Sequence, residues 1–378
     1  MESSELHPFV ETIFSSAQDW RVERCKRHRL VDILFLSLCG MISGADGFSE
    51  LEEFGKARLD WLRQFVPLSE GVPSHDTIRR IFLQMDPEVF SQCFAAWMSE
   101  VVVLSKGQVI SLDGKQLRGM KDIASGRYGF YLVGAWAWEN GLCLAQEKVD
   151  EKSNEITALP QVLSLLDIEG QIVTIDAMGT QRAIAEQIIE QGGDYMLSLK
   201  ENQGGMYEEA VEFFEEEAKT DFLFVETDQS QNWDKGHGRI EQRIWTVAFD
   251  VETLTSYEKW RGLQAIIRIE ATRWINEKVE QSTRYYLSSC KRTAQQFNRN
   301  IRSHWGIENS MHWILDVVFH EDLSRIRTDH APQNMALLRK MALNMIKANK
   351  GKSSVKTARL KAAWNTESLQ QLIFGNNL

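Results

Sequence analysis

The chain has 378 residues, of which 43% are hydrophobic and 25% are charged, so it is long enough for two or three domains with a sizeable core. Its five cysteines form no Cys-x-x-Cys pair, which argues against a disulfide scaffold or a zinc knuckle and is typical of a reducing cytoplasm. The first residues lack the pattern of a signal peptide. The strongest apolar run, Leu30–Ile42, is too short to span a bilayer, so we expect a buried helix and no membrane partner.

The net charge of −10 argues mildly against a nucleic-acid partner, but the basic residues are unevenly distributed. Residues 331–378 contain eight Lys or Arg and one acidic residue, Glu367, and the segment Arg21–Arg29 is also basic. Separate basic patches on an acidic chain can bind phosphates locally, although a solvated surface is the commoner explanation for either patch alone. Composition leaves both interpretations open.

Residues 1–104 are predicted to form a helical domain, because apolar residues recur there at helical spacing. A polar-headed helix is expected in GVPSHDTIRRIF, where Ser74 can cap the first turn. This helix carries Thr77, Arg79 and Arg80, which could enter a DNA groove. The commoner alternative is a helix that only packs against its neighbours. The domain is accordingly a candidate for binding DNA ends.

From about residue 105 the apolar period changes to that of strands. Residues 105–218 read in the order β-β-β-α-β-α-β, which predicts a mixed sheet flanked by helices. Short strand-like runs over residues 219–289 predict a β-rich insertion, and helices resume over residues 290–346. Residues 347–378 are predicted to be a basic C-terminal tail. The expected fold class is therefore α/β.

Two of the predicted strands end in an aspartate. Alternation in GQVISLDG places Asp113 on the same face as Ser111, and alternation in GQIVTIDAMG places Asp176 on the same face as Thr174. Carboxylates just beyond strand ends are common active-site positions, and charged groups there are costly unless they are paired or bind a cation. One such aspartate is as often a turn residue or a helix cap, but two on matching strands favour a site.

A third carboxylate, Glu308, is predicted on a helix that begins near Thr293. Successive steps of 100° place it within an apolar sector that contains Ile301 and Trp305, so we expect it to point inward, where burial raises a carboxyl pKa. Three carboxylates without cysteine ligands favour Mg²⁺ or Mn²⁺. Two such ions roughly 4 Å apart activate the attacking oxygen and stabilise the leaving oxygen in phosphodiester chemistry.

The same helix offers a rival metal site. His304, Glu308 and His312 follow one another at intervals of four residues and could line one helix face as zinc ligands. The outer two would lie about 12 Å apart along the axis, so they would surround a single ion poorly. A structural role is the simpler explanation for His312. The sequence contains no P-loop and no dinucleotide-binding glycine pattern.

Six stretches of the chain carry a resemblance to a known family: VISLDGKQLRG, DEKSNEITALPQVL, IVTIDAMGTQ, GGDYMLSLKENQG, GHGRIEQR and IRSHWGIENSMHWILDVVFHEDLSRIR. Together they resemble the ISAs1-type insertion-sequence transposases, which include the H-repeat-associated proteins. The resemblance covers nearly the whole chain. That family is similar to DDE transposases with an RNase H-like core. The resemblance implies that Asp113, Asp176 and Glu308 form a catalytic metal-binding triad for two Mg²⁺ or Mn²⁺ ions, and that a β-rich insertion precedes the helix with the glutamate.

The resemblance also implies partners. These are DNA, both as the terminal inverted repeats of a mobile element and as the target, and a second copy of the chain in the synaptic complex. A bacterial cytoplasmic protein associated with the nucleoid is then expected. Further DNA contacts are assigned to polar and basic residues in or near the quoted motifs: Lys115, Lys200, Asn202, Gln203, His237, Arg239, Arg243, Arg302, His304 and Asn309.

One motif departs from the related IS4 group, which carries Tyr, Arg, Glu and Lys at the spacing Y-x2-R-x3-E-x6-K. When the two are aligned on Glu308, the other three positions hold Ile301, His304 and Leu315. Three nearby polar residues are candidates to replace the missing phosphate contacts: Arg302, His304 and Asn309. We therefore do not expect the hairpin intermediate of that group to carry over.

The leading hypothesis is a transposase in which water attacks the phosphodiester at the end of the element and the freed 3′-hydroxyl then attacks target DNA. Asp113 and Asp176 would hold the metal ions, and Glu308 would complete their shell. Two alternatives stay open: a catalytically degenerate DNA-binding remnant of an insertion sequence, and a structure-selective host nuclease on the same core. The presence of all three acids with their flanking motifs favours the first hypothesis.

Overall fold

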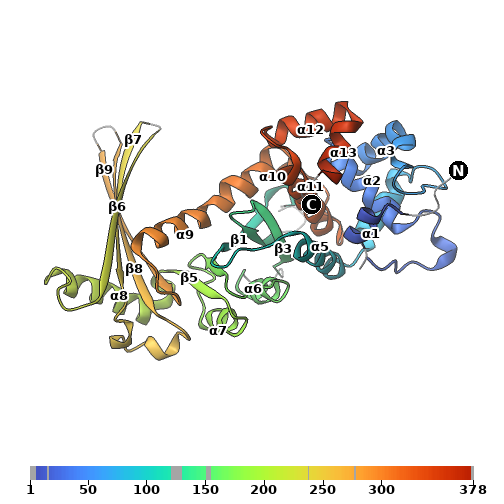
Figure 1. Cartoon of the computed structure of the whole chain (residues 1–378). Coiled ribbons are helices and arrows are strands. Elements are labelled where there is room, and N and C mark those ends of the chain that lie inside the picture. Colours follow the sequence, from blue (N-terminus) through green and yellow to red (C-terminus); the bar gives the residue numbers. More distant parts are fainter. Residues whose placement is uncertain are drawn as a thin grey trace.

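The computed structural model describes residues 6–14, 17–120, 130–149, 155–236, 238–275 and 278–375. The molecule is elongated, with helices from both ends of the chain gathered at one end and a blade of long strands at the other (Figure 1). In the described part of the chain, no helix is long and apolar enough to cross a membrane.

Five helices precede the sheet: α1 (Pro8–Phe14), α2 (Leu30–Ile42), α3 (Phe48–Leu62), α4 (His75–Gln84) and α5 (Pro87–Val101). The apolar run predicted to be a buried helix is α2, in which every residue except Val31 is buried. The predicted cap of α4 is also present, because the Ser74 hydroxyl accepts a hydrogen bond from the Thr77 backbone N–H. The helical prediction for this region is confirmed.

A mixed sheet follows, with strands β1 (Val109–Leu117), β2 (Phe130–Ala137), β3 (Leu142–Lys148), β4 (Ile172–Ile175), β5 (Asp194–Leu199), β6 (Thr227–Gly236), β7 (Arg239–Ala248), β8 (Ala265–Ile275) and β9 (Lys278–Ser288). Their order is β3-β2-β1-β4-β5-β9-β8-β7-β6. β1, β4 and β5 pair in parallel, whereas β1, β2 and β3 form an antiparallel meander. This first part is the RNase H-like arrangement that the resemblance implies, and the α/β fold class is confirmed.

Three helices connect these strands: α6 (Glu155–Ser164), α7 (Arg182–Glu190) and α8 (Gly204–Ala218). α6 lies between β3 and β4 in the chain, α7 between β4 and β5, and α8 between β5 and β6. The order predicted for residues 105–218 is therefore confirmed. In the sequence, apolar residues recur every three to four residues in the segments that form helices, and this spacing separates them from the strands.

The strands of the predicted insertion do not form a separate sheet. β9 pairs antiparallel with β5, and β8, β7 and β6 continue outward from it. Figure 1 shows these strands as a long blade with α8 beside it. The insertion therefore shares its sheet with the core, and its innermost strand borders the ends of the core strands.

The C-terminal segment is folded onto the N-terminal helices. It consists of α11 (Ala331–Asn349), α12 (Val355–Trp364) and α13 (Thr366–Phe374). α11 packs against α2 and β3, and α12 and α13 pack against both α11 and α2. Most of the predicted basic tail therefore forms α12 and α13. The apolar residues of these helices are buried in the same core as those of α2.

This packing also changes the interpretation of the C-terminal basic patch. Arg339, Lys340 and Arg359 are buried, and they are three of the eight basic residues over 331–378. Arg359 lies over the ring of Phe319, 4.2 Å from its centroid, and lies 3.4 Å from a carboxylate oxygen of Asp46. These three side chains are therefore enclosed and do not contribute to a surface that binds phosphates.

The helix that leads to Glu308 is α9 (Ala294–Ile307), which crosses one face of the sheet. Its predicted start is confirmed, because the Thr293 and Gln296 side chains each accept a hydrogen bond from the other's backbone N–H. Beyond α9 the chain forms one π-helical turn, Glu308–His312, and then a short helix, α10 (Trp313–Val317).

A close contact sets the distance between the end of α9 and the sheet. Gly306 packs against the ring of Trp138, and a Cβ at residue 306 would lie 1.6 Å from a ring carbon. Trp138 follows β2 in the turn to β3, so only glycine lets α9 approach this turn so closely. Glu308 comes two residues later, so the same contact helps to place its carboxylate.

We expect Gly306→Ala to lower the free energy of unfolding by about 1–3 kcal/mol, because the added methyl group overlaps the Trp138 ring. Denaturant titration followed by circular dichroism measures the change. Gly205→Ala is the matched control, because nothing lies within 4 Å of a Cβ there and alanine favours the helix. Equal stability of the two variants would show that the position of α9 does not depend on this contact.

Candidate active site

The register between β1 and β4 brings two of the predicted carboxylates together. Ser111 pairs with Thr174, and their hydroxyl oxygens are 3.1 Å apart. Two residues further along each strand, on the same face of the sheet, are Asp113 and Asp176. The prediction that alternation places each aspartate on the face of this serine or threonine is confirmed.

Backbone hydrogen bonds orient Asp176. Its Oδ1 atom accepts from the N–H of Met178 at 3.1 Å and from the N–H of Gly179 at 3.2 Å. Short polar side chains commonly accept such bonds where a strand ends in a turn. The second carboxylate oxygen, Oδ2, accepts neither bond, so it can contact a ligand in the pocket.

Asn202 and Gln203, two of the predicted DNA contacts, brace the loop that follows Asp176. The Asn202 amide donates to the Ala177 carbonyl at 2.7 Å, and the Gln203 amide donates to the Thr180 carbonyl at 2.8 Å. These bonds give both residues a clear part in shaping the site. Their contact with DNA stays a prediction.

α9 brings the third carboxylate to the same place. His304 Nδ1 lies 3.1 Å from the Thr174 hydroxyl oxygen, which attaches the helix to the strand that ends beside Asp176. One turn later, Glu308 lines a pocket of about 460 Å³ together with Asp113 and Asp176. The three predicted carboxylates therefore meet at one pocket above the strand ends.

The expectation that Glu308 points inward is wrong, because its side chain is exposed. Regular helical steps place this residue in an apolar sector, but α9 ends at Ile307 and a π-helical turn begins at Glu308. At this point the helix also lies over an open pocket and not over the apolar core.

The carboxylates of the site repel one another. Burial, followed by the charges of Asp176, Glu155 and Glu308, raises the pKa of Asp113 to about 7. Burial and nearby negative charges both disfavour the ionised form, so part of this rise reflects negative charge close to Asp113. A divalent cation would compensate that charge, and carboxylate oxygens are the ligands that Mg²⁺ and Mn²⁺ prefer. The donor atoms present therefore fit these ions.

The side chains do not form a closed cage. Among the described residues, no three His, Cys, Asp or Glu side chains are grouped closely enough to hold a metal ion. This includes the rival zinc set, in which His304 bonds to Thr174 and His312 Nδ1 lies 3.5 Å from an Asp113 oxygen. Burial lowers the pKa of His304 to about 4 and that of His312 to about 3, so both are neutral near pH 7.

Sequence reasoning missed a fourth carboxylate, Glu155, at the start of α6. Burial and the charge of Asp176 raise its pKa. It lies directly against Gly114, where a Cβ would come within 2.1 Å of a Glu155 carboxylate oxygen. Glu155 lies within the stretch DEKSNEITALPQVL, which carries part of the family resemblance, but no local spacing connects α6 with the end of β1.

Three basic residues, Lys200, Arg273 and Arg284, line the same pocket as the carboxylates. Lys200 was predicted from its motif, and the two arginines were not. The guanidinium of Arg284 lies over the ring of Trp305, 4.6 Å from its centroid. The pocket therefore combines carboxylates that fit a cation with cations that fit a phosphate.

Lys115, another predicted DNA contact, is held in a buried ion-pair network. Its ammonium group pairs with Asp316 and lies 2.6 Å from a carboxylate oxygen of Glu321, and its side chain is only 11% exposed. Glu321 is fully buried, and the charges of Lys115 and Lys340 hold its pKa near 2 against the effect of burial. This geometry favours a structural role for Lys115.

Two predicted arginines are also engaged in ion pairs. Arg243 lies 2.6 Å from Asp234 and 2.8 Å from the buried Glu241, and its side chain is 11% exposed. Arg302 lies 3.4 Å from the same Asp234 oxygen but is half-exposed. Arg302 therefore keeps some access to solvent, whereas Arg243 is enclosed.

Two of the remaining predicted contacts are exposed, and the third cannot be placed. Arg239 at the start of β7 and Asn309 in the π-helical turn are both exposed, as a contact with DNA requires. His237, between β6 and β7, lies outside the described residues.

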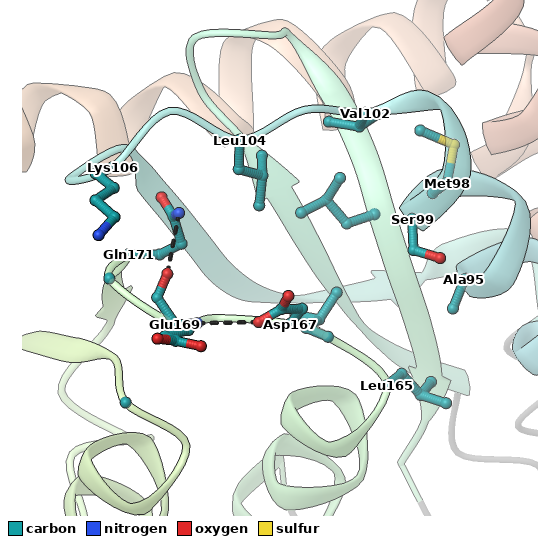
Figure 2. Close-up of a pocket in the computed structure, with 14 residues that line it drawn as sticks. Ala95, Met98, Ser99, Val102, Leu104, Lys106, Leu165, Asp167, Glu169 and Gln171 are labelled. Atoms are coloured by element: carbon teal, nitrogen blue, oxygen red, sulfur yellow. Dashed lines mark hydrogen bonds between the residues drawn. The ribbon is translucent and has the colours of Figure 1, made fainter.

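A separate cavity of about 560 Å³ lies at the opposite ends of the core strands, and none of the predicted site residues lines it. Figure 2 shows it between the end of α5, with Met98 and Val102, and the loop before β4, with Asp167 and Glu169. The backbone N–H of Glu169 donates to the Asp167 carboxylate at 3.2 Å, so these acids stabilise their own loop. They are therefore suitable positions for control substitutions.

Comparison with known proteins identifies the family. Residues 104–345 match the family model described as Transposase DDE domain, and residues 12–98 match the model described as DDE_Tnp_1-associated. The "H repeat-associated putative transposase YhhI" of Escherichia coli (strain K12) is 37% identical over 384 residues, which cover 100% of both chains. The "Putative transposase YncI" of Escherichia coli O157:H7 is 38% identical over 378 residues, which cover 99% of this chain and 95% of the relative.

A third relative, the "Inactive transposase YbfQ" of Escherichia coli (strain K12), is 39% identical over 84 residues, which cover 22% of this chain and 95% of the relative. Among solved structures, a piggyBac transposase synaptic complex with hairpin DNA aligns with a TM-score of 0.43 and 10% identity, over 98% of this chain and 77% of that chain. Because the Transposase DDE domain model matches more than half of the chain, and relatives more than 30% identical cover its full length, this chain belongs to the DDE transposase family.

Proposed function

We propose that this protein is an active DNA transposase that requires Mg²⁺ or Mn²⁺. It cuts the phosphodiester at the ends of its element and joins the freed 3′-hydroxyl to target DNA. The observation that carries the proposal is the meeting of Asp113, Asp176 and Glu308 at one pocket that basic residues also line. Membership of the family supports DNA as the substrate. An exposed Glu308 also suits a long polymer, which must reach the site from outside.

In this proposal Asp113 and Asp176 hold the metal ions and Glu308 completes their shell. When bound, two such ions activate the attacking oxygen and stabilise the leaving oxygen. The contribution of the chain is positioning: the strand register sets the two aspartates side by side, and the bond from His304 to Thr174 sets the helix above them. Among the described residues, these carboxylates are not grouped closely enough to hold one ion, so we propose that they move together as the ions bind.

The N-terminal helical domain is proposed to bind the DNA ends. The basic segment and α4, which the sequence marks separately, meet at a pocket of about 540 Å³ whose lining includes Arg27 and Arg80. Arg79 and Arg80 are both exposed on α4. We further propose that two copies act together, because an element has two ends and each copy contributes one carboxylate pocket.

We expect Asp176→Asn and Glu308→Gln each to lower cleavage by at least roughly 10³-fold, because each removes a metal ligand. The assay uses a labelled DNA fragment that carries the repeats flanking the gene, with Mg²⁺ or Mn²⁺. Affinity for the fragment should change little. Asp167→Asn and Glu169→Gln, in the cavity of Figure 2, are matched controls and should cut like the wild type.

The same assay separates the alternatives. Full cleavage by either triad variant would contradict the assigned roles. Binding without cleavage by the wild-type protein, under both metals, would favour the degenerate remnant. Cleavage that follows the structure of the DNA and ignores the repeat sequence would favour the host nuclease.

A second prediction concerns the pH dependence of stability. Burial and neighbouring charges raise the pKa of Asp113 in the folded protein to about 7, so the folded state binds the Asp113 proton more tightly than the unfolded state. The stability that this proton contributes is lost as pH rises through about 7. In EDTA, Asp113→Asn should therefore raise the Tm by roughly 2–4 °C at pH 8 and have little effect at pH 4.5. At pH 8, Mg²⁺ should raise the Tm of the wild type but not that of Asp113→Asn. A gain of equal size at both pH values would show that charge repulsion is not its cause.

The N-terminal prediction is tested by binding. Arg79→Ala combined with Arg80→Ala should weaken binding of the repeat fragment by roughly tenfold and reduce its salt dependence, because two phosphate contacts are lost. Fluorescence anisotropy in EDTA measures both effects, and light scattering of the same complexes gives the number of copies. Unchanged affinity would argue against this domain as the DNA-end binder, and one copy per pair of ends would argue against the dimer.

A further inference from the structure

The pairing that joins the insertion to the core also places two cations beside the carboxylates. In the antiparallel register of β5 with β9, Ser198 faces Tyr286 and Leu199 faces Tyr285. The next residues in the same register are Lys200 and Arg284, so they lie opposite each other where β5 ends. Ser198 and Tyr286 both line the carboxylate pocket, and Lys200 and Arg284 each lie two residues from one of them. Because side chains alternate along a strand, Lys200 and Arg284 lie on the face that borders this pocket.

Arg284 differs from the arginines around it. Arg243 and Arg273 both pair with the buried Glu241, at 2.8 Å and 3.0 Å. No carboxylate in the described ranges pairs with Arg284, and its guanidinium lies instead over the face of Trp305. An aromatic face holds a guanidinium in place by a cation–π contact, and the N–H groups that do not bond to the Tyr286 side chain stay available for the bonds that a phosphate accepts.

The location of Arg284 suits a substrate that passes through the site. A second cavity of about 690 Å³ adjoins the carboxylate pocket, and both are lined by Asp176, Lys200 and Arg284. Trp305 precedes Glu308 by three residues and so lies about one helical turn from it. α9 therefore holds Arg284 through Trp305 and, one turn later, leads to the carboxylate of Glu308.

The polar residues of α9 are poorly suited to this role. Arg302 shares the Asp234 carboxylate at 3.4 Å. His304 bonds to the Thr174 hydroxyl, and burial lowers its pKa to about 4, so it carries no positive charge at neutral pH. Positive charge near the three acids must therefore come from other elements than this helix.

We infer that Arg284 and Lys200 form a phosphate-binding subsite that takes a DNA phosphodiester beside the carboxylate pocket, with Trp305 as the positioning residue for Arg284. The inference rests on the proposed function, because it assigns a substrate contact to that same site. A strand of the insertion supplies the cation that the motif of α9 lacks. The insertion is thus a working part of the active site.

The test compares Arg284→Gln and Arg284→Lys with Arg261→Gln. Arg261 also belongs to the insertion, but it is half-exposed and pairs with Glu190 at 2.6 Å, away from the pocket. Affinity for the repeat fragment and its salt dependence are measured in EDTA, and the cleavage rate is measured at saturating DNA with Mg²⁺. Thermal melting of each variant confirms that it is folded.

We expect Arg284→Gln to bind roughly tenfold more weakly, to lower the slope of log affinity against log salt by about one, and to cut about 10²-fold more slowly. Arg284→Lys should recover part of the binding, since it restores the charge without the planar fork. Trp305→Leu should lower the cleavage rate with a smaller change in salt slope, because the charge remains but is no longer held.

Arg284→Gln that matches Arg261→Gln in affinity, salt slope and rate would overturn the inference. If the wild-type protein still cuts the repeat fragment, the proposed function would stand even though the subsite is rejected. If the wild-type protein binds DNA but does not cut it, the proposed function fails and the binding comparison alone decides: equal affinities of the two variants reject the subsite, and a tenfold difference supports it.

Discussion

The parallel pairing of β1 with β4 is the interaction on which the candidate site depends. It aligns Ser111 with Thr174, and one pleat later it aligns Asp113 with the residue that follows β4, Asp176. The same row of hydroxyl groups receives His304 from α9. A slip of one residue in this register would turn one aspartate to the opposite face of the sheet and would break the attachment of the helix.

Electrostatics explains why such a site needs partners. Asp113 is surrounded by other carboxylates, and burial and their charges raise its pKa to about 7. The folded chain therefore carries an arrangement that is unfavourable until cations arrive, which is a common property of functional sites. On the neighbouring strands, Lys200 and Arg284 place positive charge within the same pocket. Acidic and basic side chains are thus held at one pocket by neighbouring strands of one sheet and by the helical segment that carries Glu308.

The continuity of that sheet connects the insertion with catalysis. Because β9 pairs directly with β5, its side chains continue the face on which the carboxylates lie. At the other end of the molecule, α11 packs between α2 and β3, so helices from both ends of the chain form one cluster beside the core. Movement of these helices would therefore be transmitted to the core through a packed helix and not through a flexible linker.

Local patterns predict those parts of the structure whose cause is local. Alternation identifies Asp113 and Asp176, and helical spacing of apolar residues places the start of α9 near Thr293. Long-range packing determines the rest, and the sequence shows it poorly. Glu155 comes beside Asp113, and Arg284 lines the pocket, only through the tertiary fold, although each lies in or near a recognisable segment.

The exposure of Glu308 shows a second limit. Helical spacing gives the direction of a side chain but not what that side chain meets, and α9 is regular up to Ile307, the residue before Glu308. Burial also depends on what lies opposite the helix, which is an open pocket and not the core. The tail from residue 347 illustrates the same point, because its charges suggested a surface segment and its apolar residues pack it against α2.

Anomalous scattering from Mn²⁺ in crystals of the protein with a duplex of its terminal repeat tests the central claim most directly. The account predicts manganese peaks within coordination distance of Asp113 and Asp176, with Glu308 drawn into the shell and the DNA backbone beside them. Peaks elsewhere on the protein, or DNA bound away from this pocket, would contradict it.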